Sequence, residues 1–419
     1  MVKLTYPIKP FAVLFVFLFI NNMDAQWSQV SLPNVTINCL AANKDASVLF
    51  AGTDSLGIYS TSNNGDSWQK KDNGGLTISC NAINTQTSNY LAGTSNGLYV
   101  SQDNGNTWGT NSAITGITDS HINTVCWDYS GTYIFVGTNS GIFIMASGKQ
   151  GQFTTGNTGL TNTTINVLYD FKDPHTKIEN TWCGTNAGLF VSSDMGAHWT
   201  TTPVTNQVNA LIANSLVCTA AGFYEDNFNP GITGWSGLLK SGLEDTNLLT
   251  ENLFSNIPDN YLYVGTGTNG KVYCSINWGA TWKDVSGGLK VNKVKALCQL
   301  GPYLIAGTNN GIWRITLQQL LTAIEDNQSK LTNNFSLLQN FPNPFNPSTN
   351  INYSVPKASI VTIKVYNMLG KELTTLVNEE KSAGNYSVKF NGKQLSSGIY
   401  FYKMLAGSFV ETKKLILMK

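Results

Sequence analysis

One short pattern recurs along most of the chain and constrains its fold more than any other feature. An apolar or aromatic run ends in Gly-Thr, and a few turn residues, a glycine and a second β-prone run follow. Successive copies are 34 to 47 residues apart, which is typical of an array of similar structural units. The seven copies are LFAGTDSLGIYS (49–60), YLAGTSNGLYVS (90–101), IFVGTNSGIFIM (134–145), TWCGTNAGLFVS (181–192), LVCTAAGFYED (216–226), LYVGTGTNGKVYCS (262–275) and YLIAGTNNGIWRI (303–315).

Each copy predicts four short strands. The two β-prone runs joined by a Gly/Asn/Ser turn indicate a hairpin, and an apolar–polar run such as INTVCW (122–127) precedes it. In four copies a further strand is expected to begin at a Trp after the hairpin. Four antiparallel strands in about 40 residues are typical of a propeller blade. The sequence therefore predicts an all-β chain with a seven-bladed β-propeller over residues 27–318.

The ends of this array are expected to join. The seventh copy ends at Thr316 without a fourth strand, whereas the stretch WSQVSLP (27–33) resembles the fourth-strand region that begins at Trp282. We expect residues 27–31 to pair with the seventh copy, because a closed ring leaves no exposed sheet edge to aggregate.

An octet of fixed pattern follows the hairpin in four copies: TSNNGDSW (61–68), SQDNGNTW (101–108), SSDMGAHW (192–199) and SINWGATW (275–282). The Asp or Asn is expected to accept hydrogen bonds from backbone N–H groups two residues on, the Gly to take a positive φ, and the Trp to be buried beneath the hairpin. Asn63 and Asn277 stand where the other copies have Asp, which a turn tolerates and an ionised catalytic group does not. We interpret the octet as structural. Its residues are Thr61, Asn63, Gly65, Trp68, Ser101, Asp103, Gly105, Trp108, Ser192, Asp194, Gly196, Trp199, Ser275, Asn277, Gly279 and Trp282.

The octet resembles the Asp-box, or BNR repeat, of sialidases, sortilin-type receptors, xyloglucan-degrading glycosidases and photosystem II assembly factor-like propellers. This resemblance implies that it lies in the turn between the third and fourth strands, on the face away from any active site. It speaks for the fold and carries little information about activity.

The acidic and basic residues limit the enzyme classes. Resemblance to sialidases would imply three arginines around a substrate carboxylate, but Arg314 is the only arginine of the chain. Other glycosidases need two carboxylates about 5–10 Å apart, and no pair is recognisable from spacing. The candidates outside the octets are Asp128, Asp170, Asp173, Glu179, Glu225, Asp226, Glu244, Asp245 and Glu251. We expect a non-catalytic ring that binds an extracellular glycan or protein, with an extracellular glycoside hydrolase as the alternative.

Cysteine and histidine spacing gives no sign of a metal site, and we predict no catalytic residue, cofactor or metal. His121, His175 and His198 are far apart, and the cysteines form no C-x-x-C pair. Their places in apolar runs favour buried free thiols, although an exported protein can also hold one or two disulfides. The cysteines are Cys39, Cys80, Cys126, Cys183, Cys218, Cys274 and Cys298. The segment 223–260 departs from the repeat and is either a functional insertion or simple drift.

The N-terminus predicts export. Lys3 and Lys9 precede a ten-residue apolar run (11–20), and Ala25 provides a small residue for cleavage, so we interpret residues 1–25 as a signal peptide. The apolar run is too short to span a bilayer, which takes about 20 residues. No other stretch is apolar enough for a transmembrane helix.

The last part of the chain predicts a separate unit. After a polar linker (319–336), residues 337–419 alternate between polar and apolar positions in runs separated by turn residues, which indicates a small antiparallel Ig-like β-sandwich. This unit has ten Lys against four acidic residues, net +6, whereas residues 27–318 have 13 basic against 18 acidic side chains, net −5. The lysines are scattered, so we expect no nucleic-acid partner.

Four motifs of this unit resemble the type A C-terminal sorting domain of the type IX secretion system: NFPNPFNPSTNINYSVP, VYNMLGKEL, SSGIYFYK and KKLILMK. The resemblance implies that the type IX machinery is a partner and that the protein is secreted or displayed at the outer-membrane cell surface, cleaved near the linker. We expect it to be a monomer. The residues implied in the recognition signal are Lys413, Lys414, Leu415, Ile416, Leu417, Met418 and Lys419.

Overall fold

The computed structural model describes residues 26–32, 34–71, 78–110, 114–146, 151–172, 179–212, 216–226, 235–239, 242–254, 261–276, 281–320, 335–340, 343–382 and 384–418. Within these ranges every regular element is a strand, apart from one helical turn at residues 317–320. The prediction of an all-β chain is therefore confirmed. The predicted signal peptide (1–25) and most of the predicted linker lie outside the described residues.

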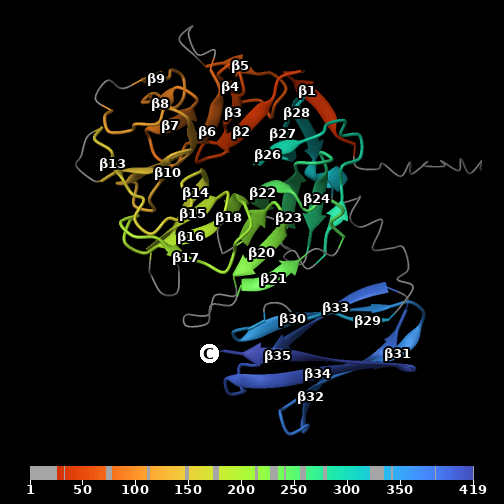
Figure 1. Cartoon of the computed structure of the whole chain (residues 1–419). Helices are drawn as coiled ribbons and strands as arrows, with labels where there is room; N and C mark the ends of the chain where they lie inside the picture. The colour runs from red at the N-terminus through yellow and green to blue at the C-terminus, as the bar shows by residue number, and fades with distance from the viewer. Residues whose placement is uncertain are drawn as a thin grey trace, which may run out of the picture.

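The repeat region forms seven four-stranded antiparallel sheets (Figure 1). Their first strands are β2 (Ile37–Ala42), β6 (Cys80–Asn84), β10 (Ile122–Trp127), β14 (Ile165–Lys172), β18 (Val208–Ile212), β22 (Leu248–Phe254) and β26 (Val294–Leu300). Their second strands are β3 (Leu49–Thr53), β7 (Tyr90–Thr94), β11 (Ile134–Thr138), β15 (Glu179–Thr185), β19 (Leu216–Thr219), β23 (Tyr261–Thr266) and β27 (Tyr303–Thr308).

The third strands are β4 (Ile58–Thr61), β8 (Gly97–Ser101), β12 (Gly141–Met145), β16 (Gly188–Ser192), β20 (Gly222–Asp226), β24 (Val272–Ser275) and β28 (Gly311–Thr316). The fourth strands are β5 (Gln69–Lys70), β9 (Gly109–Thr110), β13 (Thr154–Thr155), β17 (Thr200–Thr201), β21 (Trp235–Leu239), β25 (Lys283–Asp284) and, in the last sheet, β1 (Ser28–Ser31).

Strand β1 completes the last sheet, as predicted. It pairs antiparallel with β28, with Gln29 opposite Trp313. Each first strand also contacts the first strands of the sheets before and after it, and β26 contacts β2, so these seven strands form a closed circle. The chain ends of the array are thus held together by one sheet.

The Gly-Thr pair of the repeat lets neighbouring sheets approach closely. A Cβ added to Gly137 would lie 2.6 Å from a methyl carbon of Ile165, the first residue of the next sheet. The following residue, Thr138, donates its hydroxyl to the carbonyl of Gly141 at 3.0 Å and closes the hairpin turn. The pair therefore serves packing and turn formation together.

A row of asparagines adds hydrogen bonds between the sheets. The Asn in the second position of five first strands donates its amide to the backbone carbonyl of the first residue in the next sheet, for example Asn81 to Ile122 at 2.9 Å. Equivalent bonds start from Asn38, Asn123, Asn166 and Asn209. In the last sheet Lys295 takes this position, donates to Asn38 Oδ1 at 2.5 Å, and has its pKa lowered chiefly by burial.

The C-terminal unit has two antiparallel sheets around one apolar core. One has the order β29-β30-β33 and the other β32-β31-β34-β35. The strands are β29 (Ser336–Leu337), β30 (Ser348–Val355), β31 (Ser359–Tyr366), β32 (Glu372–Lys381), β33 (Gly384–Asn391), β34 (Gly398–Ala406) and β35 (Phe409–Leu417). The buried Tyr402 hydroxyl donates to the carbonyl of Leu338 and accepts from the N–H of Asn340, which fixes the segment before β30 to the core.

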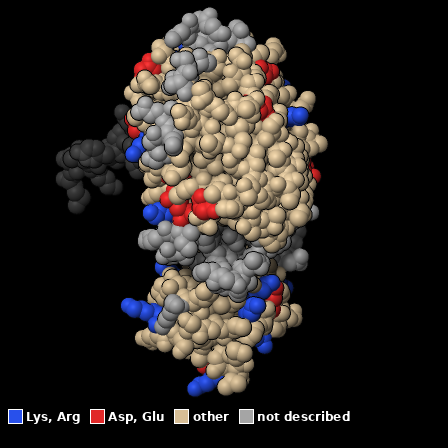
Figure 2. Space-filling model, turned by 60° about the vertical axis from the view of Figure 1, so that its left-hand side comes forward, with Lys and Arg blue, Asp and Glu red and all other residues tan. Residues whose placement is uncertain are grey.

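On the face drawn in Figure 2, lysines are spread over this unit and do not merge into one basic surface.

Candidate functional site

The octets form one repeated hydrogen-bonded turn. Ser101 donates its hydroxyl to Asp103 at 2.8 Å and accepts the N–H of Gly105 at 2.8 Å. Asp103 accepts the N–H of Thr107 at 2.8 Å and its hydroxyl at 2.6 Å. Hydrogen bonds from Thr107 are the main reason that the pKa of Asp103 is lowered, so this half-buried carboxylate is ionised at neutral pH and unsuited to act as a general acid.

The sister octets repeat this geometry with different side chains. In the octet 192–199, Asp194 accepts the N–H of His198 at 2.9 Å, the first of the causes that lower its pKa to about 2. In the octet 61–68, Asn63 accepts the N–H of Ser67 at 3.0 Å, so a neutral amide fills the same place. Ser275 and Trp282 of the fourth octet are buried, while Asn277 and Gly279 lie outside the described residues.

The expected offset of these hydrogen bonds was wrong. The Asp or Asn side chain accepts the backbone N–H of the residue four positions on. This happens because two successive residues in the octet take a positive φ and turn the chain back. At Asn104 φ is 58° and at Gly105 it is 82°. Gly65 and Gly196 also have the predicted positive φ, at 85° and 80°.

The octet tryptophans share buried clusters with residues of their own hairpins, as expected, for example Trp282 with Tyr273, and they also contact the preceding sheet. Trp108 lies edge-on to Phe50 of the preceding sheet, with ring centroids 6.2 Å apart, and Trp282 lies similarly against Phe223 at 5.4 Å. The indole N–H of Trp199 donates to the carbonyl of Gly156, which follows the fourth strand of the preceding sheet. Trp108, Trp199 and Trp282 are buried, and Trp68 is half-buried.

Two aromatic residues outside the octets occupy equivalent positions. Phe153 is buried directly before β13, and Trp27 is buried directly before β1. The Trp27 indole donates to the carbonyl of Val285 at 2.8 Å, as Trp199 does to Gly156. Phe153 was not predicted, although an aromatic residue followed by a β-prone Thr-Thr pair was a usable signal.

The structure brings two of the candidate acids together. Asp170 in β14 has Glu179 of β15 as a neighbour, and this carboxyl is one of the causes that raise the pKa of Asp170. Asp170 also accepts the N–H of Tyr129 at 2.8 Å and the hydroxyl of Thr181 at 2.7 Å. The pKa of Asp170 is raised to about 7, chiefly by burial and also by Glu179. The hydrogen bonds from Thr181 and Tyr129 act in the opposite direction and lower this pKa. Spacing alone did not reveal this pair. A glycosidase needs its two carboxyls about 5–10 Å apart, on either side of the substrate.

The other candidate acids have structural partners or are not described. Asp128 accepts the N–H groups of Thr132 and Tyr133 in its own turn, at 2.6 and 2.8 Å. Burial would raise the pKa of Asp245, but hydrogen bonds from backbone N–H groups, first that of Asn247, give it a net lowered pKa. The carboxylate of Glu244 lies 3.7 Å from Lys271. Asp173 and His175 lie outside the described residues, and only the backbone is described for Glu225, Asp226 and Glu251.

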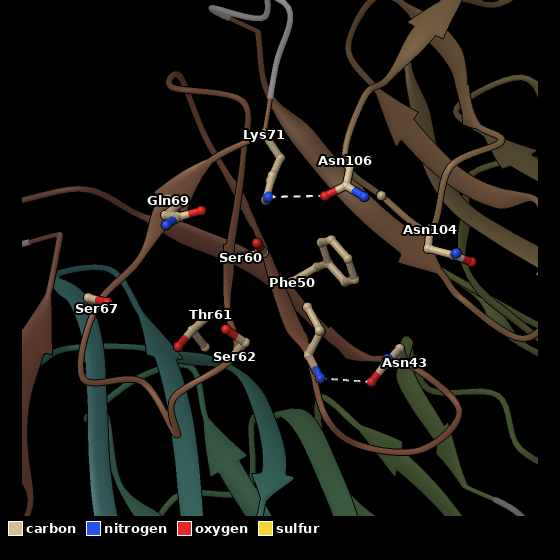
Figure 3. A pocket seen from close by; sticks show the side chains of 12 residues that line it. Asn43, Phe50, Ser60, Thr61, Ser62, Ser67, Gln69, Lys71, Asn104 and Asn106 are labelled. Atoms are coloured by element: carbon tan, nitrogen blue, oxygen red, sulfur yellow. Dashed lines mark hydrogen bonds between the residues drawn. The ribbon is translucent and has the colours of Figure 1, made fainter.

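A polar cavity of about 280 Å³ lies between the first two sheets, next to the first two octets (Figure 3). Ser, Thr, Asn and Gln side chains form most of its wall, with Phe50 at its base and Lys71 at one side. Lys71 donates to Asn106 Oδ1 at 3.2 Å and so links the two sheets. Among the described residues that line it there is no Asp, Glu, His or Cys, so this cavity offers hydrogen-bond donors and acceptors without a general acid.

The part of the chain that the structure describes has no cluster of three or more His, Cys, Asp or Glu side chains suited to a metal ion. The described residues also include no helix long and apolar enough to cross a membrane. Among the described residues no cysteine is in a disulfide, and five of the seven cysteines are buried.

Residues 339–418 match the family model described as the secretion system C-terminal sorting domain. The type IX sorting domain predicted from the four motifs is therefore confirmed. This tail defines the class of protein: one exported by the type IX system and either secreted or held at the cell surface. No curated protein matches the sequence.

Among solved structures, the chain is similar to PorZ of Porphyromonas gingivalis, described as an essential bacterial surface component of the type IX secretion system. The similarity has a TM-score of 0.46 at 14% sequence identity, over 89% of this chain and 58% of the PorZ chain. The chain thus spans less than two thirds of that structure.

In the sorting domain, β35 carries most of the residues implied in the recognition signal. Leu415 and Leu417 are buried in the core, Lys413 pairs with Glu411 at 2.8 Å, and Lys414 is exposed. Lys419 lies outside the described residues.

Proposed function

We propose that residues 27–318 form a seven-bladed β-propeller of Asp-box type that binds an extracellular ligand without catalysing a reaction. The seven four-stranded sheets, the closed circle of first strands and the closing strand β1 support the propeller. The identical hydrogen bonds of octets 61–68, 101–108 and 192–199 support the Asp-box assignment. Because Asn63 replaces Asp without changing the turn, the octet needs no ionised group.

The lining of the cavity between the first two sheets carries the ligand proposal, which places the ligand beside the octets and not on the opposite face that the Asp-box resemblance implies. Hydroxyl and amide side chains can both donate and accept, which suits the hydroxyl groups of a glycan. Gln69 and Asn106 are exposed on opposite sides of the cavity, and Lys71 bridges toward Asn106. A glycan is therefore the ligand that this site fits best, with a protein surface as the second choice.

A glycan array probed with the purified mature protein tests this function, together with a reducing-end assay on each polysaccharide that binds. We expect saturable binding with no release of reducing ends. The double variant Gln69→Ala/Asn106→Ala should lose binding. Thr200→Ala is the matched control, because Thr200 is an exposed first residue of the fourth strand in another sheet, as Gln69 is in the first.

The alternative, a glycoside hydrolase, is favoured by one observation: the pKa of Asp170 is raised to about 7 and this carboxyl adjoins Glu179. A carboxyl that is partly protonated at neutral pH can act as a general acid. If the protein releases reducing ends and Asp170→Asn abolishes that release, the hydrolase is the correct function.

We also propose the division of the chain and the role of its ends. Residues 1–25 direct export across the inner membrane, residues 319–336 form the linker, and residues 337–419 direct passage across the outer membrane with Lys413–Lys419 as part of the signal. Removal of residues 337–419 should leave the propeller in the periplasm. Normal surface display of the truncated protein would refute this role.

A further inference from the structure

Two cysteines from neighbouring sheets meet over one glycine. Cys39 lies in β2 of the first sheet and Cys80 begins β6 of the second sheet. A Cβ added to Gly52 would be 2.6 Å from Cys39 Sγ and 2.8 Å from Cys80 Sγ, so both sulfur atoms face the same point. The Cys39 thiol also lies 4.0 Å from the carbonyl oxygen of Cys80.

The repeat itself builds this contact. In the fourth sheet, Val167 takes the place of Cys39, and Val208 of the fifth sheet takes the place of Cys80. A Cβ on Gly184 would lie 2.6 Å from a methyl of Val167 and 2.5 Å from a methyl of Val208. The fold therefore holds these two positions in contact whichever side chains occupy them, and only at the first junction are both of them cysteine.

The two thiols also affect each other's ionisation. The neighbouring Cys39 thiol is the largest of the causes that raise the pKa of Cys80, and burial is the next. Cys39 is half-buried, whereas Cys80 is 1% exposed. Cys39 is therefore the thiol that a reagent from outside can reach first.

We propose that Cys39 and Cys80 form a disulfide after export, which joins the first two sheets covalently. The sorting domain marks a protein that is secreted or held at the cell surface, and disulfides form and persist outside the cytoplasm. The oxidant is an external disulfide, supplied by a thiol–disulfide oxidase or by oxidised glutathione.

The exchange has two steps. The Cys39 thiolate, having lost its proton to solvent, attacks one sulfur of the external disulfide and releases the other as a thiolate. Cys80 then loses its proton and attacks the Cys39 sulfur, which releases the second external thiolate. The two cysteines lose two electrons and two protons in total, and the external disulfide is reduced to two thiols.

The disulfide joins the first two sheets. The same two sheets line the polar cavity, for example with Phe50 and Gly105. It would limit the relative movement of these sheets. The inference itself rests on the thiol geometry alone and holds whether or not the cavity binds a glycan.

Peptide mapping of the full-length exported protein tests the proposal. The protein is incubated with oxidised glutathione, free thiols are alkylated, and non-reduced peptides are compared with reduced ones by mass spectrometry. We expect one linked pair that contains residues 39 and 80, lighter by two hydrogen atoms than the two reduced peptides. The proposal fails if Cys39 and Cys80 are alkylated separately, or if either is linked to a different cysteine.

Variants give a second readout. Reduction should lower the melting temperature of the oxidised wild type to that of the oxidised Cys39→Ser protein, which should not respond to reductant. Cys298→Ser, which removes another half-buried thiol, should keep both the linked peptide and the response to reductant. An equal response in Cys39→Ser and wild type would overturn the proposal, and the peptide map of the wild type remains decisive if a variant fails to fold.

Discussion

Trp27 connects the closing strand to the rest of the ring, and its replacement by alanine is the sharpest test of that closure. The side chain is 4% exposed and packs in a core that includes Val285, Trp313 and Leu320. Its indole N–H donates to the carbonyl of Val285 and its backbone N–H to that of Gly287, both at 2.8 Å. The alanine variant keeps the backbone bond but loses the ring and the indole bond.

The loss can be given a magnitude. Truncation of a buried Trp to Ala costs about 3–5 kcal/mol, and an unpaired buried carbonyl adds about 1 kcal/mol. At roughly 2 °C for each kcal/mol in a domain of this size, Trp27→Ala should melt about 8–12 °C below wild type. Thermal unfolding followed by far-UV circular dichroism measures this, with Tyr129→Ala as a control, since Tyr129 is 61% exposed and its loss should change little. A melting temperature for Trp27→Ala equal to that of Tyr129→Ala would show that β1 does not hold the ring together.

Three further predictions concern the octet, the acid pair and the sheet junctions. Asp103→Asn should unfold at the same urea concentration as wild type, whereas Asp103→Ala should lose about 1 kcal/mol in the same titration because the turn loses its acceptor. For Asp170 the folded pKa of about 7 lies above the ordinary value of 3.8, so its contribution to stability is most favourable below pH 3.8 and declines as the pH rises toward and through 7. Melting temperatures between pH 5 and 8 should therefore fall less steeply in Asp170→Asn than in wild type. Gly137→Val should prevent close approach of the third and fourth sheets and lower the yield of folded protein in a refolding assay, because an added Cβ meets Ile165 at 2.6 Å.

The repeat made much of the fold predictable. Because Gly-Thr recurs with turn residues after it, the hairpins, the all-β class and the role of residues 28–31 follow from the printed sequence. The positive φ of Gly105 follows as well, since glycine takes that conformation at little steric cost. These features depend on a few neighbouring residues and on the similarity between copies.

Contacts between sheets were harder to predict. Spacing along the chain does not say that Trp108 will meet Phe50 of the preceding sheet or, within one sheet, that Asp170 of β14 will have Glu179 of β15 as a neighbour. Cys39 and Cys80 are 41 residues apart, and only the register of both sheets against Gly52 brings their sulfurs together. The polar cavity likewise arises from side chains of two octets that the sequence identified separately.

The central claim is that the exported ring binds a ligand and does not transform it. The most direct measurement titrates a glycan selected on the array into the purified full-length protein and assays reducing ends in the same samples. We predict saturable binding that Gln69→Ala/Asn106→Ala removes and Thr200→Ala keeps, with reducing ends constant over time. Reducing ends that increase in proportion to the protein, and that disappear in Asp170→Asn, would contradict the account.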